Sequence, residues 1–305
     1  MRFLPRPPPI FTHRNIKFNL IIINFMNKKI GLFWLRDDFR ISKNNGLIEA
    51  TTNHDQVVVF YLYKKLTYKF QEAQKWWLSK SLIYFRKNLE KLNINLEIIE
   101  TESFKIFFEK LFKKNDFSLY WNKVYEPDYS KFDEYLVKNL KDKGILYKIC
   151  KGNVLNEIHE IKKNDGTPFK VFTPFWRTAE RYYIEKIPSK EKLIKKCLKS
   201  KNYFQNSLNP KEILPNNNWF KNFENLWFPS EENALKQLRN FIKNKISNYT
   251  DSRNFPNIIG TSKLSPFIKF GQIHVETIWN ECEKIKPKNL GISKFLAEIG
   301  WREFN

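Results

Sequence analysis

The residues best suited to chemistry lie in the last segment of the sequence, FLAEIGWREFN (residues 295–305). Glu298, Trp301 and Arg302 are spaced i, i+3 and i+4, which places them on one face of a helix. A carboxylate accepts hydrogen bonds, a guanidinium binds anions, and an indole offers a flat face for stacking. The spacing therefore indicates a binding or catalytic surface, with a buried core tryptophan as the alternative for Trp301.

A second candidate segment, YTDSRNFPNIIGTSKLSPFIKFG, spans residues 249–271. Thr261, Ser262 and Ser265 stand just ahead of Pro266 and an apolar run. This pattern predicts a helix with hydroxyl residues at or near its N-cap and proline at its first position. The free backbone N–H groups of such a helix suit a phosphate or pyrophosphate. A capped helix without a ligand is the simpler interpretation of this segment alone.

Together the two segments resemble the DNA photolyase and cryptochrome family of flavoproteins. The shared pattern is a tyrosine, Arg-x-x-Pro, Thr-Ser-(Arg/Lys)-Leu-Ser-Pro and later Glu-x-x-Trp-Arg-Glu-Phe, in fitting order and spacing. Residues 30–40 (IGLFWLRDDFR) and 121–127 (WNKVYEP) resemble the family's opening strand and its Asn-x-x-Tyr-Glu-Pro loop. The family usually has Arg where Lys263 stands, so the charge is kept but bidentate geometry is lost.

The resemblance implies light-driven splitting of cyclobutane pyrimidine dimers in UV-damaged DNA, by electron transfer from reduced FAD. It implies that Trp301 stacks on the extruded base and Glu298 bonds to the lesion, both as catalytic residues. It also implies that Arg253 and Arg302 contact DNA phosphates. The implied FAD contacts are Tyr249, Thr261, Ser262, Lys263, Leu264, Ser265 and Phe295. An antenna pigment of the folate or deazaflavin type is possible for this family, and the sequence does not identify it.

Two other functions within the family remain open. A cryptochrome-type signalling flavoprotein senses blue light without repairing DNA. Glu298 together with Trp301 favours repair, because plant-type cryptochromes commonly lose this tryptophan. A (6-4) photolyase is the other alternative, and its additional catalytic histidines belong to family sequence beyond the equivalent of residue 305.

The elements that must position these residues begin with an α/β pattern. Apolar runs over residues 30–35, 56–63, 95–99, 118–121 and 146–150 predict buried strands. Helices are predicted between them over residues 74–92, 103–113 and 133–143. The alternation predicts a parallel, Rossmann-like sheet. Because the first turn lacks GxGxxG, the ordinary dinucleotide site is not expected there.

The sequence predicts four regions. Residues 1–25 form a proline-rich leader that is non-native or disordered, with Met26 as the natural start, and residues 26–155 form the α/β domain. Residues 156–218 form a linker, in which residues 164–177 supply aromatic packing between domains and residues 190–201 form a basic, solvated surface. Residues 219–305 begin a helical FAD-binding domain, helical from Trp227 onward except for residues 249–260. Since the family continues further, we expect this domain to be incomplete.

The net charge of +22, from 54 Lys and Arg against 32 Asp and Glu, favours a polyanion such as DNA. A Lys- and Asn-rich composition, as AT-rich coding produces, explains the charge equally well. Three scattered cysteines and four scattered histidines indicate neither a disulfide framework nor a metal site. The cysteine pattern fits the reducing cytoplasm, and we expect a monomer there. The leader's apolar run is too short to cross a membrane.

Overall fold

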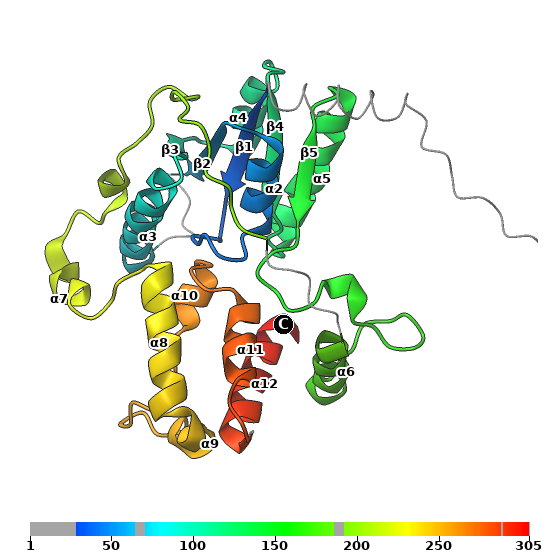
Figure 1. Cartoon of the computed structure of the whole chain (residues 1–305), viewed down its shortest axis with the longest axis vertical. Coiled ribbons are helices and arrows are strands. Elements are labelled where there is room, and N and C mark those ends of the chain that lie inside the picture. The colour runs from blue at the N-terminus through cyan, green and yellow to red at the C-terminus, as the bar shows by residue number, and fades with distance from the viewer. Residues whose placement is uncertain (1–28, 65–70, 186–191, 288, 305) are drawn as a thin grey trace, which may run out of the picture.

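The structure, a computed structural model, describes residues 29–64, 71–185, 192–287 and 289–304. Figure 1 shows a sheet flanked by helices in the upper half of the view and a group of helices below it. The predicted leader and the predicted start at Met26 lie outside the described residues.

The upper part is built on five parallel strands in the order β3-β2-β1-β4-β5. Their bounds are β1 (Ile30–Leu35), β2 (Val57–Tyr63), β3 (Asn95–Glu100), β4 (Phe117–Asn122) and β5 (Tyr147–Cys150). The predicted α/β fold with a parallel sheet is confirmed, and no predicted strand end differs from the structure by more than one residue. Because β2 and β4 flank β1 on opposite sides, the strand order reverses beside β1.

Helices cover both faces of this sheet. Helices α2 (Asn45–Asn53) and α3 (Glu72–Glu90) share a core with Phe33 and Leu35 of β1. Helices α4 (Phe104–Leu111) and α5 (Pro127–Asp142) share the other core with Leu32 and Trp34. Neighbouring side chains of β1 therefore enter opposite cores, which explains the unbroken apolar run.

The predicted helix over residues 133–143 starts too late. Helix α5 begins six residues earlier, with Pro127 at its start and Glu126 as its N-cap. Proline is well suited to the first helical position, because the N–H that it lacks has no partner inside the helix. Pro127 was predicted to lie in a loop, so this helix start was missed.

Buried polar contacts hold the loops that follow β1 and β4. Arg36 forms an ion pair with Asp133 of α5 (3.0 Å), and its Nε donates to the carbonyl of Asn122 (3.1 Å). The amide of Asn122 donates to Asn44 Oδ1 (2.8 Å) and to the carboxylate of Asp38. These contacts satisfy side chains that are costly to bury alone, and they fix the carboxyl edge of the sheet.

The segment predicted as a linker is attached to both parts. Helix α6 (Phe172–Glu185) packs against helix α12 of the helical part, where Phe175 lies 5.2 Å from Phe304. Further on, the backbone N–H of Cys197 donates to the Leu92 carbonyl (2.9 Å), and that of Leu208 to the Ile98 carbonyl (2.8 Å). Cys197 and Ser200 are buried. The described lysines of residues 190–201 are exposed, as predicted for a solvated surface, whereas Cys197 and Ser200 anchor the segment.

The lower part contains α8 (Glu231–Asn244), α9 (Tyr249–Ser252), α10 (Ser265–Lys269), α11 (Val275–Glu283) and α12 (Leu290–Phe304), preceded by the short α7 (Lys221–Glu224). The prediction that only residues 249–260 interrupt the helices is wrong. Residues 249–252 are helical, and the interruption runs from residue 253 to residue 264. Two further interruptions separate α10, α11 and α12.

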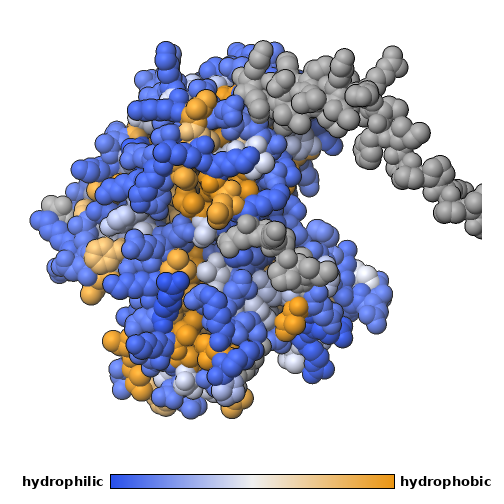
Figure 2. Space-filling model, viewed as in Figure 1, coloured by the Kyte–Doolittle hydropathy of each residue, from blue (hydrophilic) through white to orange (hydrophobic). Residues whose placement is uncertain are grey.

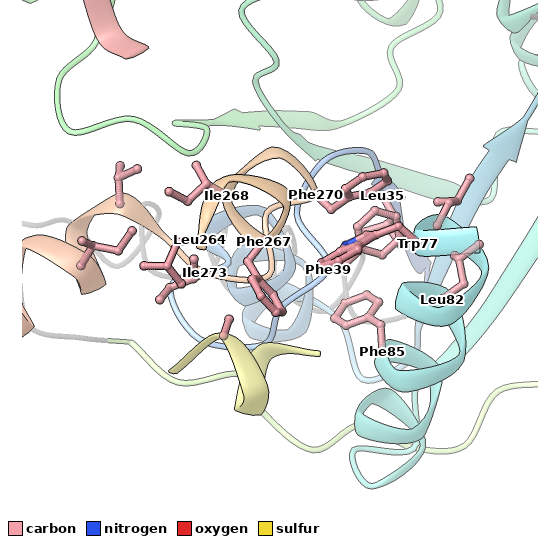
Figure 3. Close-up of a cluster of buried hydrophobic side chains, with 14 of the residues drawn as sticks. Leu35, Phe39, Trp77, Leu82, Phe85, Leu264, Phe267, Ile268, Phe270 and Ile273 are labelled. Atoms are coloured by element: carbon pink, nitrogen blue, oxygen red, sulfur yellow. The ribbon is translucent and has the colours of Figure 1, made fainter. Parts of the chain in front are cut away.

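An aromatic cluster joins the two parts (Figure 3). Trp77 of α3 packs edge-on against Phe267 (5.0 Å between ring centroids), and Phe39 lies 6.3 Å from Phe270. Gly271 follows at φ +62°, where a Cβ would lie 1.9 Å from the Asp37 carbonyl oxygen. Only glycine allows α10 to approach the loop after β1 this closely.

Most of the face shown in Figure 2 is hydrophilic. Hydrophobic residues are visible at its lower end, near α9. Phe255, Ile258 and Ile259 of the loop after α9 are exposed. The three cysteines are buried, and none forms a disulfide in the described part of the chain. Among the described residues, none of the helices is long and apolar enough to cross a membrane, and no group of His, Cys, Asp or Glu is placed to hold a metal ion.

Candidate functional site

A cavity of about 720 Å³ lies between the two parts, a size typical of small-molecule and cofactor sites. Six residues predicted from the sequence line it: Tyr249, Ser262, Ser265, Phe295, Glu298 and Arg302. The other five, which are Thr261, Lys263, Leu264, Arg253 and Trp301, are not among its lining residues. Leu264 is only 1% exposed and packs in the core.

Tyr249 and Phe295 form an aromatic corner of this cavity. The Tyr249 ring stands edge-on to Phe295 (5.5 Å, 84°) and to Phe241 of α8 (5.4 Å, 88°). Burial raises the pKa of the Tyr249 phenol, so the group stays neutral at physiological pH. The corner is therefore a fixed and uncharged surface.

The two serines are positioned by the loop from α9 to α10. Gln237 Nε2 donates to the Ser262 carbonyl (3.0 Å), and the Leu264 N–H donates to Ser262 Oγ (3.4 Å). The helix that follows has five residues, with Leu264 as its N-cap and Pro266 at its second position. The predicted hydroxyl residues near the N-cap are Ser262 and Ser265, and both line the cavity. The prediction of proline at the first helical position is wrong by one residue.

Helix α12 places its polar residues in paired contacts. Glu298 forms an ion pair with Arg253, and this hydrogen bond raises the pKa of the Arg253 guanidinium. Arg302 Nη1 donates to the Asn153 carbonyl (2.7 Å), while the rest of this side chain stays exposed. The Glu303 carboxylate accepts the backbone N–H of Leu155 (2.6 Å), which ties α12 to the segment after β5.

Trp301 differs from its two predicted companions. Glu298 and Arg302 line the cavity, whereas the Trp301 ring lies on Phe172 of α6, with centroids 3.8 Å apart and an interplanar angle of 8°. Trp301 remains 39% exposed. The single helical face predicted from spacing is thus divided between the cavity and α6.

The α/β wall of the cavity carries charged residues that the sequence analysis did not single out. Lys269 pairs with Glu126 (2.9 Å) and with Asp37 (3.3 Å), and Lys123 lines the same wall. Burial raises the pKa of Asp37, while the two carboxylates raise the pKa of Lys269. The resemblance of residues 121–127 to a family loop was the available signal for Lys123 and Glu126.

A second cavity of about 640 Å³ lies at the carboxyl edge of the sheet. It is lined by Tyr61 and Leu62 of β2, by residues of the loops after β1, β3 and β4 such as Ser103, and by Tyr129 of α5. Ligands of open α/β sheets bind at this edge, where the strand order reverses. Asp37, Glu126 and Lys269 line both cavities and so form their common wall.

A family model described as DNA photolyase matches residues 31–192. The chain belongs to the DNA photolyase family. It is 30% identical over 278 residues to a deoxyribodipyrimidine photo-lyase of Agrobacterium fabrum, covering 90% of this chain and 57% of that protein. Cryptochrome-2 of Arabidopsis thaliana is 27% identical over 301 residues, covering 92% of this chain and 48% of that protein.

The fold is also found among solved structures. A bacterial class III photolyase from Agrobacterium tumefaciens matches with a TM-score of 0.80 and 29% identity, over 91% of this chain and 58% of that one. The chain therefore spans a little over half the length of the photolyase relatives that it matches.

Proposed function

We propose that this chain acts in the light-driven repair of cyclobutane pyrimidine dimers in DNA. The observation that carries the proposal is on α12, where Glu298 borders the cavity and Trp301, three residues on, keeps an exposed indole. An extruded pyrimidine needs a hydrogen-bonding group at its edge and a flat surface for its face. Photolyase relatives of similar sequence support this assignment.

We propose FAD as the cofactor of the 720 Å³ cavity, because its lining combines hydroxyl groups, charged groups and an aromatic corner. Ser262 and Ser265 supply hydroxyl groups for a pyrophosphate. The cations Lys123, Lys269 and Arg302 line the same cavity as the carboxylates of Asp37, Glu126 and Glu298. The aromatic corner of Tyr249 and Phe295 offers apolar surface to a ring system. Thr261, Lys263 and Leu264 remain proposed contacts through the same loop.

When bound and reduced, FAD supplies the light-excited electron that opens the dimer. The residues of this chain bind and orient the substrate. Glu298, held by Arg253, is placed to accept a hydrogen bond from the imide N–H of a pyrimidine. Arg253 and the exposed part of Arg302 are proposed to contact DNA phosphates.

We propose the 640 Å³ cavity as the site of an antenna pigment of the folate or deazaflavin type. Phe104, Tyr129 and Phe132 give it an aromatic wall, and Lys64 and Lys105 add positive charge. Both pigment types combine a planar ring with anionic groups, so the wall does not discriminate between them. Absorbance of the purified protein with each pigment added separately distinguishes the two.

We also propose that the protein acts as a monomer in the cytoplasm. Three buried cysteines without a disulfide among the described residues fit a reducing compartment. Light scattering coupled to gel filtration measures the oligomeric state directly.

The function is tested by titrating the chain with two oligonucleotides, identical except for one thymine dimer. We expect tighter binding of the damaged strand, a flavin spectrum on reconstitution with FAD, and no preference in the Trp301→Ala variant. Dimer splitting under blue light is then assayed with this chain and with a chimera that adds the remaining length of the Agrobacterium fabrum relative. Flavin binding with equal affinity for both strands would contradict repair and favour the cryptochrome alternative.

A further inference from the structure

The indole of Trp301 is held on one side by a second aromatic ring. Phe172 lies parallel to it at 3.8 Å between centroids, and Phe304 meets it edge-on at 5.8 Å. Trp301 is nevertheless 39% exposed. With one face covered by Phe172, the exposed surface belongs to the opposite face and the free ring edge.

Phe172 has a second aromatic neighbour with a parallel ring. The Trp176 ring, one helical turn further along α6, lies parallel to Phe172 (7°) at 6.3 Å. Trp176 presses against Gly300, where a Cβ would lie 2.2 Å from its ring, and stands 6.1 Å from Trp279 of α11. Two adjacent residues of α12 therefore contact α6, because Gly300 packs against Trp176 and Trp301 stacks on Phe172.

We propose that Phe172 is a positioning residue for base stacking by Trp301. This inference rests on the proposed repair function and adds to it Phe172 of α6, which belongs to the aromatic segment 164–177 that was predicted to serve packing. Phe172 takes one face of the indole and sets its plane, so that an extruded pyrimidine stacks on the other face. The bound arrangement is a stack of three rings, Phe172, Trp301 and the base.

Pre-organisation is the physical reason. A rotamer-rich side chain that must be ordered on binding reduces affinity, whereas a ring already fixed by its neighbours does not. Without Phe172 the Trp301 side chain gains freedom, and damaged DNA must order it again. We expect Phe172→Leu to lower the preference for damaged over undamaged DNA about 2- to 10-fold.

The test is a mutant cycle on the full chain with the two oligonucleotides described above. Phe172→Leu should reduce the preference, Phe172→Tyr should retain it because the ring is kept, and Phe172→Leu should add nothing in a Trp301→Ala background. Phe169→Leu is the matched control, because Phe169 packs against Phe175 in the same aromatic cluster. Equal losses for both oligonucleotides, or additive losses in the double variant, would overturn the proposal.

A second measurement separates this proposal from the repair function. The tryptophans are labelled with 5-fluorotryptophan, and the ¹⁹F resonance of Trp301 is assigned by its loss in Trp301→Phe. We expect Phe172→Leu to shift that resonance, whereas Phe169→Leu leaves it in place. An unchanged resonance overturns the positioning role. If Phe172→Leu shifts the resonance but the wild-type chain shows no preference for damaged DNA, Phe172 still positions the indole. That result contradicts the repair function and, with it, the proposed stacking of a base.

Discussion

Lys269 Nζ lies 2.9 Å from the carboxylate of Glu126, a contact that joins the helical part to the loop after β4. Its second partner, Asp37, belongs to the loop after β1. These three charged side chains separate the two cavities at the carboxyl edge of the sheet. A single cation of α10 therefore binds two loops of the α/β part at the place where both proposed ligands approach.

Replacing this cation tests its contribution to stability. We expect Lys269→Met to lower the free energy of unfolding by about 1 kcal/mol at low salt, because two partly exposed ion pairs are lost. The loss should shrink in 1 M NaCl, where charges are screened within about 3 Å. Urea unfolding at both salt concentrations measures it. Lys105→Met is the control, since its pair with Glu109 is more exposed, at 3.9 Å; an equal loss there would contradict the assignment.

Gly271 lies at the same junction, and replacing it should affect stability more than replacing Lys269. Gly271→Ala should destabilise the protein by several kcal/mol, because the added Cβ overlaps the Asp37 carbonyl in addition to the unfavourable positive φ. Gly144 has the same φ of +62° with no atom near its Cβ position. Gly144→Ala isolates the backbone cost, about 1–2 kcal/mol. Thermal or urea unfolding compares the two variants, and similar losses would show that the close approach contributes little.

The sequence predicted elements whose signals are local. The unbroken apolar run of residues 30–35 is typical of a strand that is buried on both faces of a parallel sheet. Both ends of β1 were therefore predicted correctly. Pro127 also carried a local signal, but the motif around it was interpreted as a loop, and the start of α5 was missed.

Contacts between segments that are distant in the chain could not be predicted from the sequence. Phe172 and Trp301 are 129 positions apart, and Lys269 reaches partners at positions 37 and 126. No periodicity encodes such pairs, because they depend on how α6 and α10 pack against the rest of the chain. The family resemblance named Glu298 and Trp301 together, yet only the packing of α12 shows that they face different neighbours.

Glu303 gives the protein a pH-dependent stability. Burial raises its pKa to about 7, so between the ordinary pKa of 4.5 and pH 7 the folded protein keeps a proton that the unfolded chain releases. The unfolded state then binds fewer protons, and stability falls as the pH rises through this window and levels above it. At about 1.4 kcal/mol per pKa unit, the group contributes a decrease of about 3 kcal/mol.

Glu303→Gln removes this titration while keeping a carbonyl oxygen for the Leu155 N–H. We expect the unfolding free energy of the variant to change less between pH 4.5 and pH 7.5 than that of the wild type. Glu232→Gln, in the first turn of α8, serves as the control for a neutralised glutamate. A wild-type slope that persists in Glu303→Gln would assign the pH dependence to another group.

Trp301→Ala tests the proposed lesion surface. We expect binding of dimer-containing DNA to weaken by about 1–3 kcal/mol, the range for stacking of one base on an aromatic side chain. Flavin binding should be unchanged, because Trp301 is not among the residues that line the 720 Å³ cavity. Trp219, 42% exposed and outside α12, provides the matched control. Trp219→Ala should leave both affinities as they are, whereas an equal loss in the two variants, or equal losses for damaged and undamaged DNA, would remove Trp301 from the lesion site.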